Sequence, residues 1–129
     1  MTSEKTIVNS EKAPAPIGPY NQARWAGSTL YVSGQIPLNA ESGNLENDTI
    51  EAATHRVMKN VGFILHQAGL DFDDLVKCTI LLTDINDFQQ VNEVYGQYFT
   101  NISPAREAFQ VTALPKGAKV EISAIAYKN

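Results

Sequence analysis

An amphipathic segment at residues 48–69 constrains the fold of this chain more than any other stretch. Its apolar residues recur at spacings of three and four, which places them on one side of a helix. They are Ala53, Val57, Val61, Ile64, Leu65 and Ala68. Asp48, with Glu51 three residues later, is predicted to cap the start of this helix, and Gly69 to end it. A helix with one apolar side must pack against another layer, so we expect a sheet from the rest of the chain.

Several segments are typical of strands. Residues 22–26 and 29–33 flank a Gly-Ser turn and predict a hairpin, and residues 6–9 predict a further short strand. Residues 75–82 are apolar on both faces, which favours an interior position in the sheet. Residues 103–126 predict two strands joined by a turn, a second hairpin.

A second helix is expected to open at residues 83–87. Its apolar stripe is predicted to consist of Phe88, Val91, Tyr95, Tyr98 and Phe99. Asn92 falls within that stripe, and an amide that faces a core must find hydrogen-bond partners. Asn92 therefore either ties down a neighbouring loop or shapes the rear of a pocket.

The order of these elements predicts an α+β fold in which residues 1–129 form one domain. Two amphipathic helices would cover one face of a mixed sheet. Two helices cannot cover both faces, and the other face would leave a large apolar patch on a monomer. We therefore expect self-association with cyclic symmetry, with sites in the clefts between subunits.

The composition excludes several classes of protein. The net charge of −4, without any run of basic residues, argues against nucleic acid as a partner. The absence of a long apolar run or a targeting segment argues against a membrane and favours the cytoplasm. The single cysteine, Cys78, rules out an internal disulfide and is expected to be a buried, inert thiol in a reducing compartment. His55 and His66 fall opposite the apolar stripe, three turns apart, so they are expected on the surface and cannot share a metal ion.

A small set of residues remains for chemistry. Arg106 can bind a carboxylate through two parallel hydrogen bonds, and Glu121 can move a proton to or from water or an amine. Tyr20 ends a proline-rich loop at residues 13–20 that should be stiff, and Gly34 is expected at a bulge or a close approach to the backbone. Spacing alone leaves other readings open: Arg106 and Glu121 as a cross-strand salt bridge, and Tyr20 as a packed surface aromatic.

Four segments in the same order resemble the reactive intermediate deaminase family of the RidA type. They are Ser103-Pro104-Ala105-Arg106 with residues 114–122 and 124–126, Ala13-Pro14 to Ile17-Gly18-Pro19-Tyr20, Ser33-Gly34-Gln35-Ile36-Pro37, and residues 84–88 with Val91-Asn92. The resemblance covers almost the whole chain.

The resemblance implies a chorismate-mutase-like fold and a homotrimer with its sites between subunits. It also implies hydrolysis of 2-imino acids, such as 2-iminobutanoate and 2-iminopropanoate, to 2-oxo acids and ammonia, without metal or cofactor. By position, Arg106 would bind the substrate carboxylate and Glu121 would position or activate water. Tyr20, Ser33, Gly34 and Asn92 would line the pocket.

One position departs from the pattern of that family. Ala108 stands where RidA-type members commonly have cysteine, so only its backbone can serve a site. Phe109 is also larger than usual, while alternation places Glu107 on the strand face opposite Arg106. Two competing functions stay open: a regulatory trimer that binds small carboxylates without turnover and, less favoured by the charge, a ribonuclease.

Overall fold

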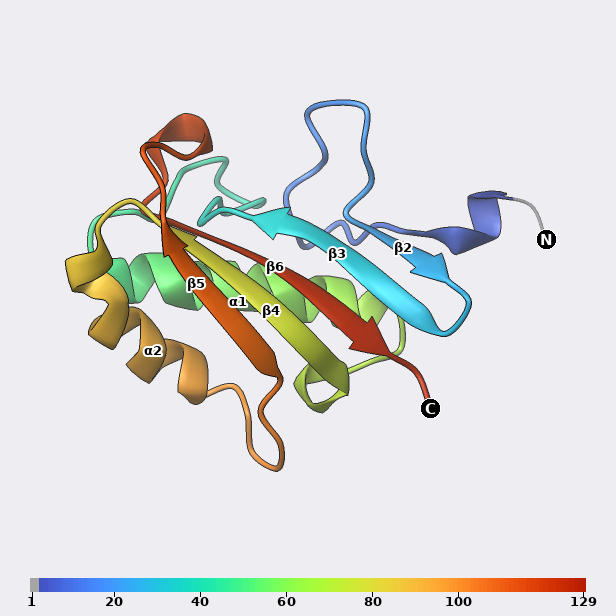
Figure 1. Ribbon diagram of the computed structural model, residues 1–129. Coiled ribbons are helices and arrows are strands. Elements are labelled where there is room, and N and C mark those ends of the chain that lie inside the picture. The colour runs from blue at the N-terminus through green and yellow to red at the C-terminus, as the bar shows by residue number, and fades with distance from the viewer. Residues whose placement is uncertain (1–2) are drawn as a thin grey trace.

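The computed structural model describes residues 3–129 and contains a single six-stranded sheet with two α-helices behind it (Figure 1). The strand order is β1-β2-β3-β6-β4-β5. The strands are β1 (Ile7–Val8), β2 (Ala23–Ala26), β3 (Thr29–Gln35), β4 (Leu75–Leu82), β5 (Ala105–Gln110) and β6 (Val120–Tyr127). The helices α1 (Ile50–Gln67) and α2 (Phe88–Gly96) lie on the same face, as the sequence predicted. No helix among residues 3–129 is long and apolar enough to cross a membrane.

Helix α1 covers the centre of the sheet through the predicted apolar stripe. Val57, Val61, Ile64 and Leu65 are completely buried. Gly69 ends the helix at a φ of 77°, as expected of a glycine stop. The start was predicted one residue early, because the hydroxyl of Thr49, and not Asp48, accepts the backbone N–H of Ala52 at 3.0 Å.

The predicted hairpin of residues 103–126 is wrong. Strands β5 and β6 are not neighbours, since β4 lies between them and pairs parallel with β5 and antiparallel with β6. The burial of the two strands explains this order. Alternate side chains of β6 are almost fully buried and suit an interior strand, whereas β5 has no buried residue and forms an edge.

The interior position of β4 is confirmed, but one of its residues faces the other way. The alternation that buries Cys78 would also bury Val76, yet Val76 is 48% exposed, and Leu75 is buried in its place. The register of β4 with β6 shifts between Leu75 and Lys77, and this irregularity reverses the alternation.

Two further expectations are corrected at the seam between the helices. His55 is half-buried and lies against Tyr98, whose hydroxyl is 2.8 Å from His55 Nδ1. His66 is exposed, as predicted. On α2, Val94 joins Val91 and Tyr95 in the core, and Asn92 is exposed instead. Asn92 therefore does not face the core.

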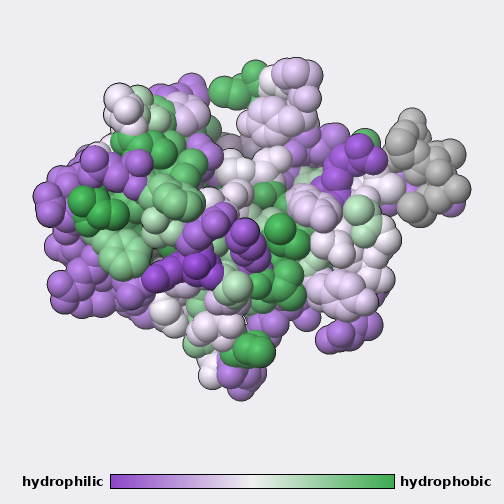
Figure 2. All heavy atoms as spheres, in the orientation of Figure 1, coloured by the Kyte–Doolittle hydropathy of each residue, from purple (hydrophilic) through white to green (hydrophobic). Residues whose placement is uncertain are grey.

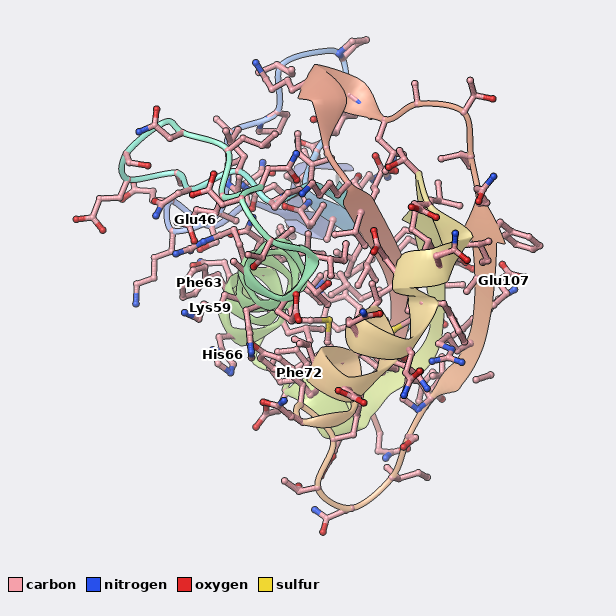
Figure 3. The ribbon with its side chains drawn as sticks, turned by 90° about the vertical axis from the view of Figure 1, so that its left-hand side faces the viewer. Glu46, Lys59, Phe63, His66, Phe72 and Glu107 are labelled. Atoms are coloured by element: carbon pink, nitrogen blue, oxygen red, sulfur yellow. The ribbon has the colours of Figure 1, made fainter. Side chains whose placement is uncertain are left out.

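The face of the sheet away from the helices is open. Tyr31 and Phe109, both on this face, are each 52% exposed. On the same face Glu107 of β5 accepts a hydrogen bond from Thr79 of β4 at 2.8 Å and pairs with Lys77 at 3.3 Å. Figure 2 shows this mixture of apolar and strongly polar side chains over the strands. In Figure 3 Glu107 projects from β5 on the side away from α1, which carries Lys59, Phe63 and His66 on its outer surface.

Candidate active site

Arg106 lies on the helix side of edge strand β5, above α2. It is in register with Cys78 of β4, which is buried beneath the helices. The Arg106 guanidinium carbon stands 5.0 Å from the ring centroid of Phe88 and 5.6 Å from that of Tyr95. One of its terminal nitrogens, Nη1, donates a hydrogen bond to the side-chain oxygen of Asn92. No carboxylate among the described residues forms an ion pair with Arg106, whose side chain is exposed to solvent.

Ala108 follows Arg106 on the same side of β5. Its methyl group is half-buried and packs against the core, in register with Ile80. Glu107, between the two, points to the opposite face, as the alternation of the strand predicted. The anion of Glu107 therefore does not neutralise Arg106.

Glu121 lies on the open face of β6, half-buried. It is in register with Leu81, and its neighbours Val120 and Ile122 point to the core. Burial raises the pKa of the Glu121 carboxyl above its usual value. Among residues 3–129, no hydrogen bond to this carboxyl lowers its pKa again. A carboxyl of raised pKa exchanges protons closer to neutral pH than an ordinary glutamate does.

Gly34 is the reason that Glu121 can lie where it does. The register of β3 with β6 shifts between Val32 and Gln35, so Ser33 and Gly34 form a bulge beside the Glu121 side chain. A Cβ atom on residue 34 would stand 2.8 Å from Glu121 Cδ, closer than such atoms approach. Both readings of Gly34 from the sequence, a bulge and a close approach, are confirmed.

Ser33 and Gln22 attach the proline-rich loop to the sheet. Ser33 Oγ donates to the backbone oxygen of Asn21 at 2.7 Å. The buried amide of Gln22 accepts from Ser10 N at 2.6 Å and donates to the backbone oxygens of Ser10, Ala13 and Pro14 at 2.9–3.3 Å. Nothing in the sequence singled out Gln22, because a glutamine in a strand-like segment does not reveal its partners.

Tyr20 stands at the end of this loop, 48% exposed. It borders a hollow of about 40 Å³ together with Ile17, Gly34 and Lys116. The sequence pattern did not single out Lys116 either, although Lys116 adopts a left-handed backbone with φ of 58° in the turn before β6. This hollow places the phenol of Tyr20 and the cation of Lys116 beside Gly34, whose backbone adjoins the Glu121 side chain.

The candidate residues therefore form two separate groups within one protomer. Arg106, Asn92 and Ala108 lie at β5 and α2 on the helix side. Glu121 lies on the open side against Gly34, which adjoins Ser33 in the bulge and borders the same hollow as Tyr20. Strand β4 separates Arg106 from Glu121, and their side chains leave opposite faces of the sheet. The cross-strand salt bridge that spacing allowed does not form. Within residues 3–129, no group of three or more His, Cys, Asp or Glu side chains is placed to hold a metal ion.

The fold and the site together define a class of protein: a small α+β protein with an open sheet face, a half-buried glutamate, and an arginine that is held by an amide and has no carboxylate partner among the described residues. The family model for endoribonuclease L-PSP matches residues 10–128, and the chain belongs to this family, which includes the RidA and YjgF proteins. The resemblance inferred from the four segments is thereby confirmed.

Individual relatives are similar to this protein over nearly the whole length of the chain. The human protein named 2-iminobutanoate/2-iminopropanoate deaminase is 48% identical over 125 residues, which are 97% of this chain and 91% of that protein. A crystal structure from Thermotoga maritima, described as a putative endoribonuclease, is 46% identical with a TM-score of 0.92, covering 95% of this chain and 97% of that one. Escherichia coli TdcF with bound serine is 39% identical with a TM-score of 0.92, covering 95% and 98%.

Proposed function

We propose that this protein is a deaminase that hydrolyses small 2-imino acids, among them 2-iminobutanoate and 2-iminopropanoate, to 2-oxo acids and ammonia. The observation that carries the proposal is Arg106, an exposed guanidinium held by Asn92 and free of any carboxylate among the described residues. Such a group binds a carboxylate strongly, because its planar donors match both oxygens. The human relative that shares 48% of its residues with this chain bears the name of the same activity.

We infer that the site is completed between subunits of a homotrimer. Arg106 and Glu121 cannot meet within one protomer, since they leave opposite faces of the sheet. The open face of one copy, packed beside strand β5 of the next, would bring the two groups together and cover Tyr31 and Phe109. Because the two surfaces that meet are different, the contact repeats head to tail and can close into a ring.

The reaction follows from the chemistry of the two groups. Arg106 binds the carboxylate and so fixes the imine carbon C2 relative to the open face of the neighbour. Glu121 as a carboxylate takes a proton from the water that attacks C2 and passes it to the imine nitrogen, which gives a neutral carbinolamine. Glu121 then takes the proton of the carbinolamine hydroxyl and delivers it to the amine, so the C–N bond breaks and ammonia leaves as the C2 carbonyl forms. Imines already hydrolyse in water, so orientation and one acid–base group suffice.

In this proposal the remaining residues shape the site and take no part in proton transfer. Gly34 gives Glu121 room against β3, and Tyr20 and Ser33 border the imine. Ala108 contributes its backbone and no thiol. The substrates are small anions, and the net charge of −4 disfavours nucleic acid as a partner. The free, buried Cys78 suits the reducing cytoplasm, where we place the reaction.

The test is the clearance of 2-iminobutanoate generated in situ by a threonine dehydratase. Wild type should accelerate the formation of 2-oxobutanoate, and Arg106→Ala should return the rate to that of spontaneous hydrolysis. Arg24→Ala is the matched control, because Arg24 is also exposed on the sheet but bonds Thr6 Oγ1 instead. Equal clearance by wild type and Arg106→Ala would show that Arg106 has no part in the reaction.

A second candidate is a non-catalytic sensor of small amino or oxo acids, and the serine bound in the related TdcF favours it. Calorimetry with 2-oxobutanoate separates the two. Binding without any turnover of the imine would support the sensor, whereas turnover that depends on Arg106 supports the deaminase. A nuclease assay with Arg106→Ala as the control for contaminants decides the ribonuclease alternative.

A further inference from the structure

One face of helix α2 is built around the guanidinium of Arg106. Phe88, Asn92 and Tyr95 follow one another at spacings of four and three, so they lie in a row along the helix. All three contact Arg106: the two rings at 5.0 and 5.6 Å from Cζ, and the amide through a hydrogen bond. The sequence pattern assigned this row to the core, and nothing in it predicted a cation above the rings.

The rings are themselves fixed from below. Tyr95 is only 5% exposed, its ring stands 4.9 Å from that of Phe99, and its hydroxyl is buried beside Cys78. Phe88 is half-buried and packs against the core. The burial of Tyr95 and the packing of Phe88 against the core hold the two rings in place beneath Arg106.

Arginine is a long side chain whose rotamers are costly to fix at the moment of binding. The electron-rich face of an aromatic ring attracts the cation, and the flat guanidinium stacks on it. The amide of Asn92 accepts one of the five N–H donors, which leaves others for a ligand. A guanidinium held in this way before the ligand arrives binds more tightly, because less freedom is lost.

We infer that Phe88 and Tyr95 are positioning residues, which hold the guanidinium of Arg106 in the orientation that binds the substrate carboxylate. This inference rests on the proposed role of Arg106 as the carboxylate site. It gives two aromatic residues of the core a role in substrate binding, which their burial and their spacing along the chain do not indicate. The hydroxyl of Tyr95 has no share in it, since only the ring faces Arg106.

The experiment compares steady-state kinetics of 2-iminobutanoate hydrolysis in variants that keep or lose the ring. Phe88→Leu and Phe88→Met remove the ring but keep an apolar side chain of similar size; Phe88→Tyr and Tyr95→Phe keep a ring. We expect Phe88→Leu and Phe88→Met to raise KM by about three- to tenfold, the range of a cation–π contact at a partly exposed site, with kcat within about twofold. Phe88→Tyr and Tyr95→Phe should keep the KM of wild type.

A second measurement reports directly on the surroundings of the Arg106 side chain. The Nε–Hε resonance of Arg106 in ¹⁵N-labelled protein should be shifted by the ring currents in wild type and Phe88→Tyr, and should move toward the free-arginine position in Phe88→Leu. A variant that fails to fold is recognised by the loss of its thermal transition, and Phe88→Met then takes its place.

Three outcomes overturn the inference: an unchanged KM in both ringless variants, a KM in Phe88→Tyr as high as in Phe88→Leu, or an unchanged Arg106 resonance in Phe88→Leu. These outcomes are distinct from failure of the proposed function, which would appear as wild-type clearance by Arg106→Ala. If Arg106→Ala abolishes clearance while the ringless variants behave as wild type, the function stands and the positioning role falls.

Discussion

Gly34 and Glu121 are matched to each other, since a Cβ atom on residue 34 would stand 2.8 Å from Glu121 Cδ. The bulge of β3 thus provides the space in which the carboxyl of β6 lies against the sheet. The glycine is required by this approach and not by its backbone angles, because its φ lies outside the left-handed region.

Gly34→Ala should therefore reduce imine hydrolysis by about tenfold or more, because a displaced acid–base group loses most of its contribution. The thermal unfolding midpoint should fall only slightly, since the side chain of Glu121 can swing aside. Gly96→Ala is the control, because a Cβ atom there meets nothing within 4 Å. Clearance by Gly34→Ala at the wild-type rate would argue that Glu121 is not held in place for the reaction.

The raised pKa of Glu121 predicts a dependence of stability on pH. The folded protein holds this proton to higher pH than the unfolded chain does, so the stabilisation is complete at low pH and is lost as the pH rises through the folded-state pKa. Glu121→Gln cannot lose a proton, and it should unfold at a higher temperature than wild type at neutral pH. Melting curves from pH 4 to 8 should show the two proteins converging at the acid end; a constant difference would contradict the shift.

The activity of wild type should fall on acidification for the same reason. Glu121 acts as a base only when ionised, so kcat/KM should decline as the pH drops through its raised pKa. Glu121→Gln should retain at most a small residual rate without this decline. An acidic limb that persists in Glu121→Gln would assign the titration to another group.

Gln22 is predicted to hold the loop that carries Tyr20. Gln22→Ala leaves the backbone groups of Ser10, Ala13 and Pro14 without their buried partner, at a cost of about 2–4 kcal/mol in the free energy of unfolding. Denaturant titration measures this cost. Glu11→Ala, an exposed change in the same segment, should cost almost nothing. Similar stability of the two variants would mean that the loop is held by other contacts.

The start of α1 supplies a test of the corrected cap. Thr49→Ala removes the side-chain acceptor for Ala52 N and should cost about 1 kcal/mol, whereas Asp48→Ala should have little effect. Chemical denaturation of both variants decides between the cap that the sequence suggested and the one that the structure contains. The opposite order of stabilities would restore Asp48 as the cap.

The sequence predicted local features of this protein well, because they depend on neighbours along the chain. The apolar period of α1, its glycine stop and the hairpin of β2 and β3 each follow from residues only a few positions apart. Where a single residue perturbs the alternation, prediction from pattern was wrong. The irregularity between Leu75 and Lys77 exposed Val76 and buried Leu75 at the start of β4, and Asn92 left the core stripe that Val94 joined.

Arg106, Glu121 and Gly34 could be selected from residue chemistry and the family resemblance, but their spatial relationship could not. Two strands that are close in sequence need not be neighbours in the sheet. Strand β4 lies between β5 and β6, because the apolar β6 suits an interior position with a strand on each side, whereas the polar β5 suits the edge. Strand order and register decide which face each side chain leaves, and they depend on burial over the whole sheet. The sequence by itself thus determined the elements and the chemical groups, whereas only the tertiary structure placed Arg106 over α2 and Glu121 on the open face.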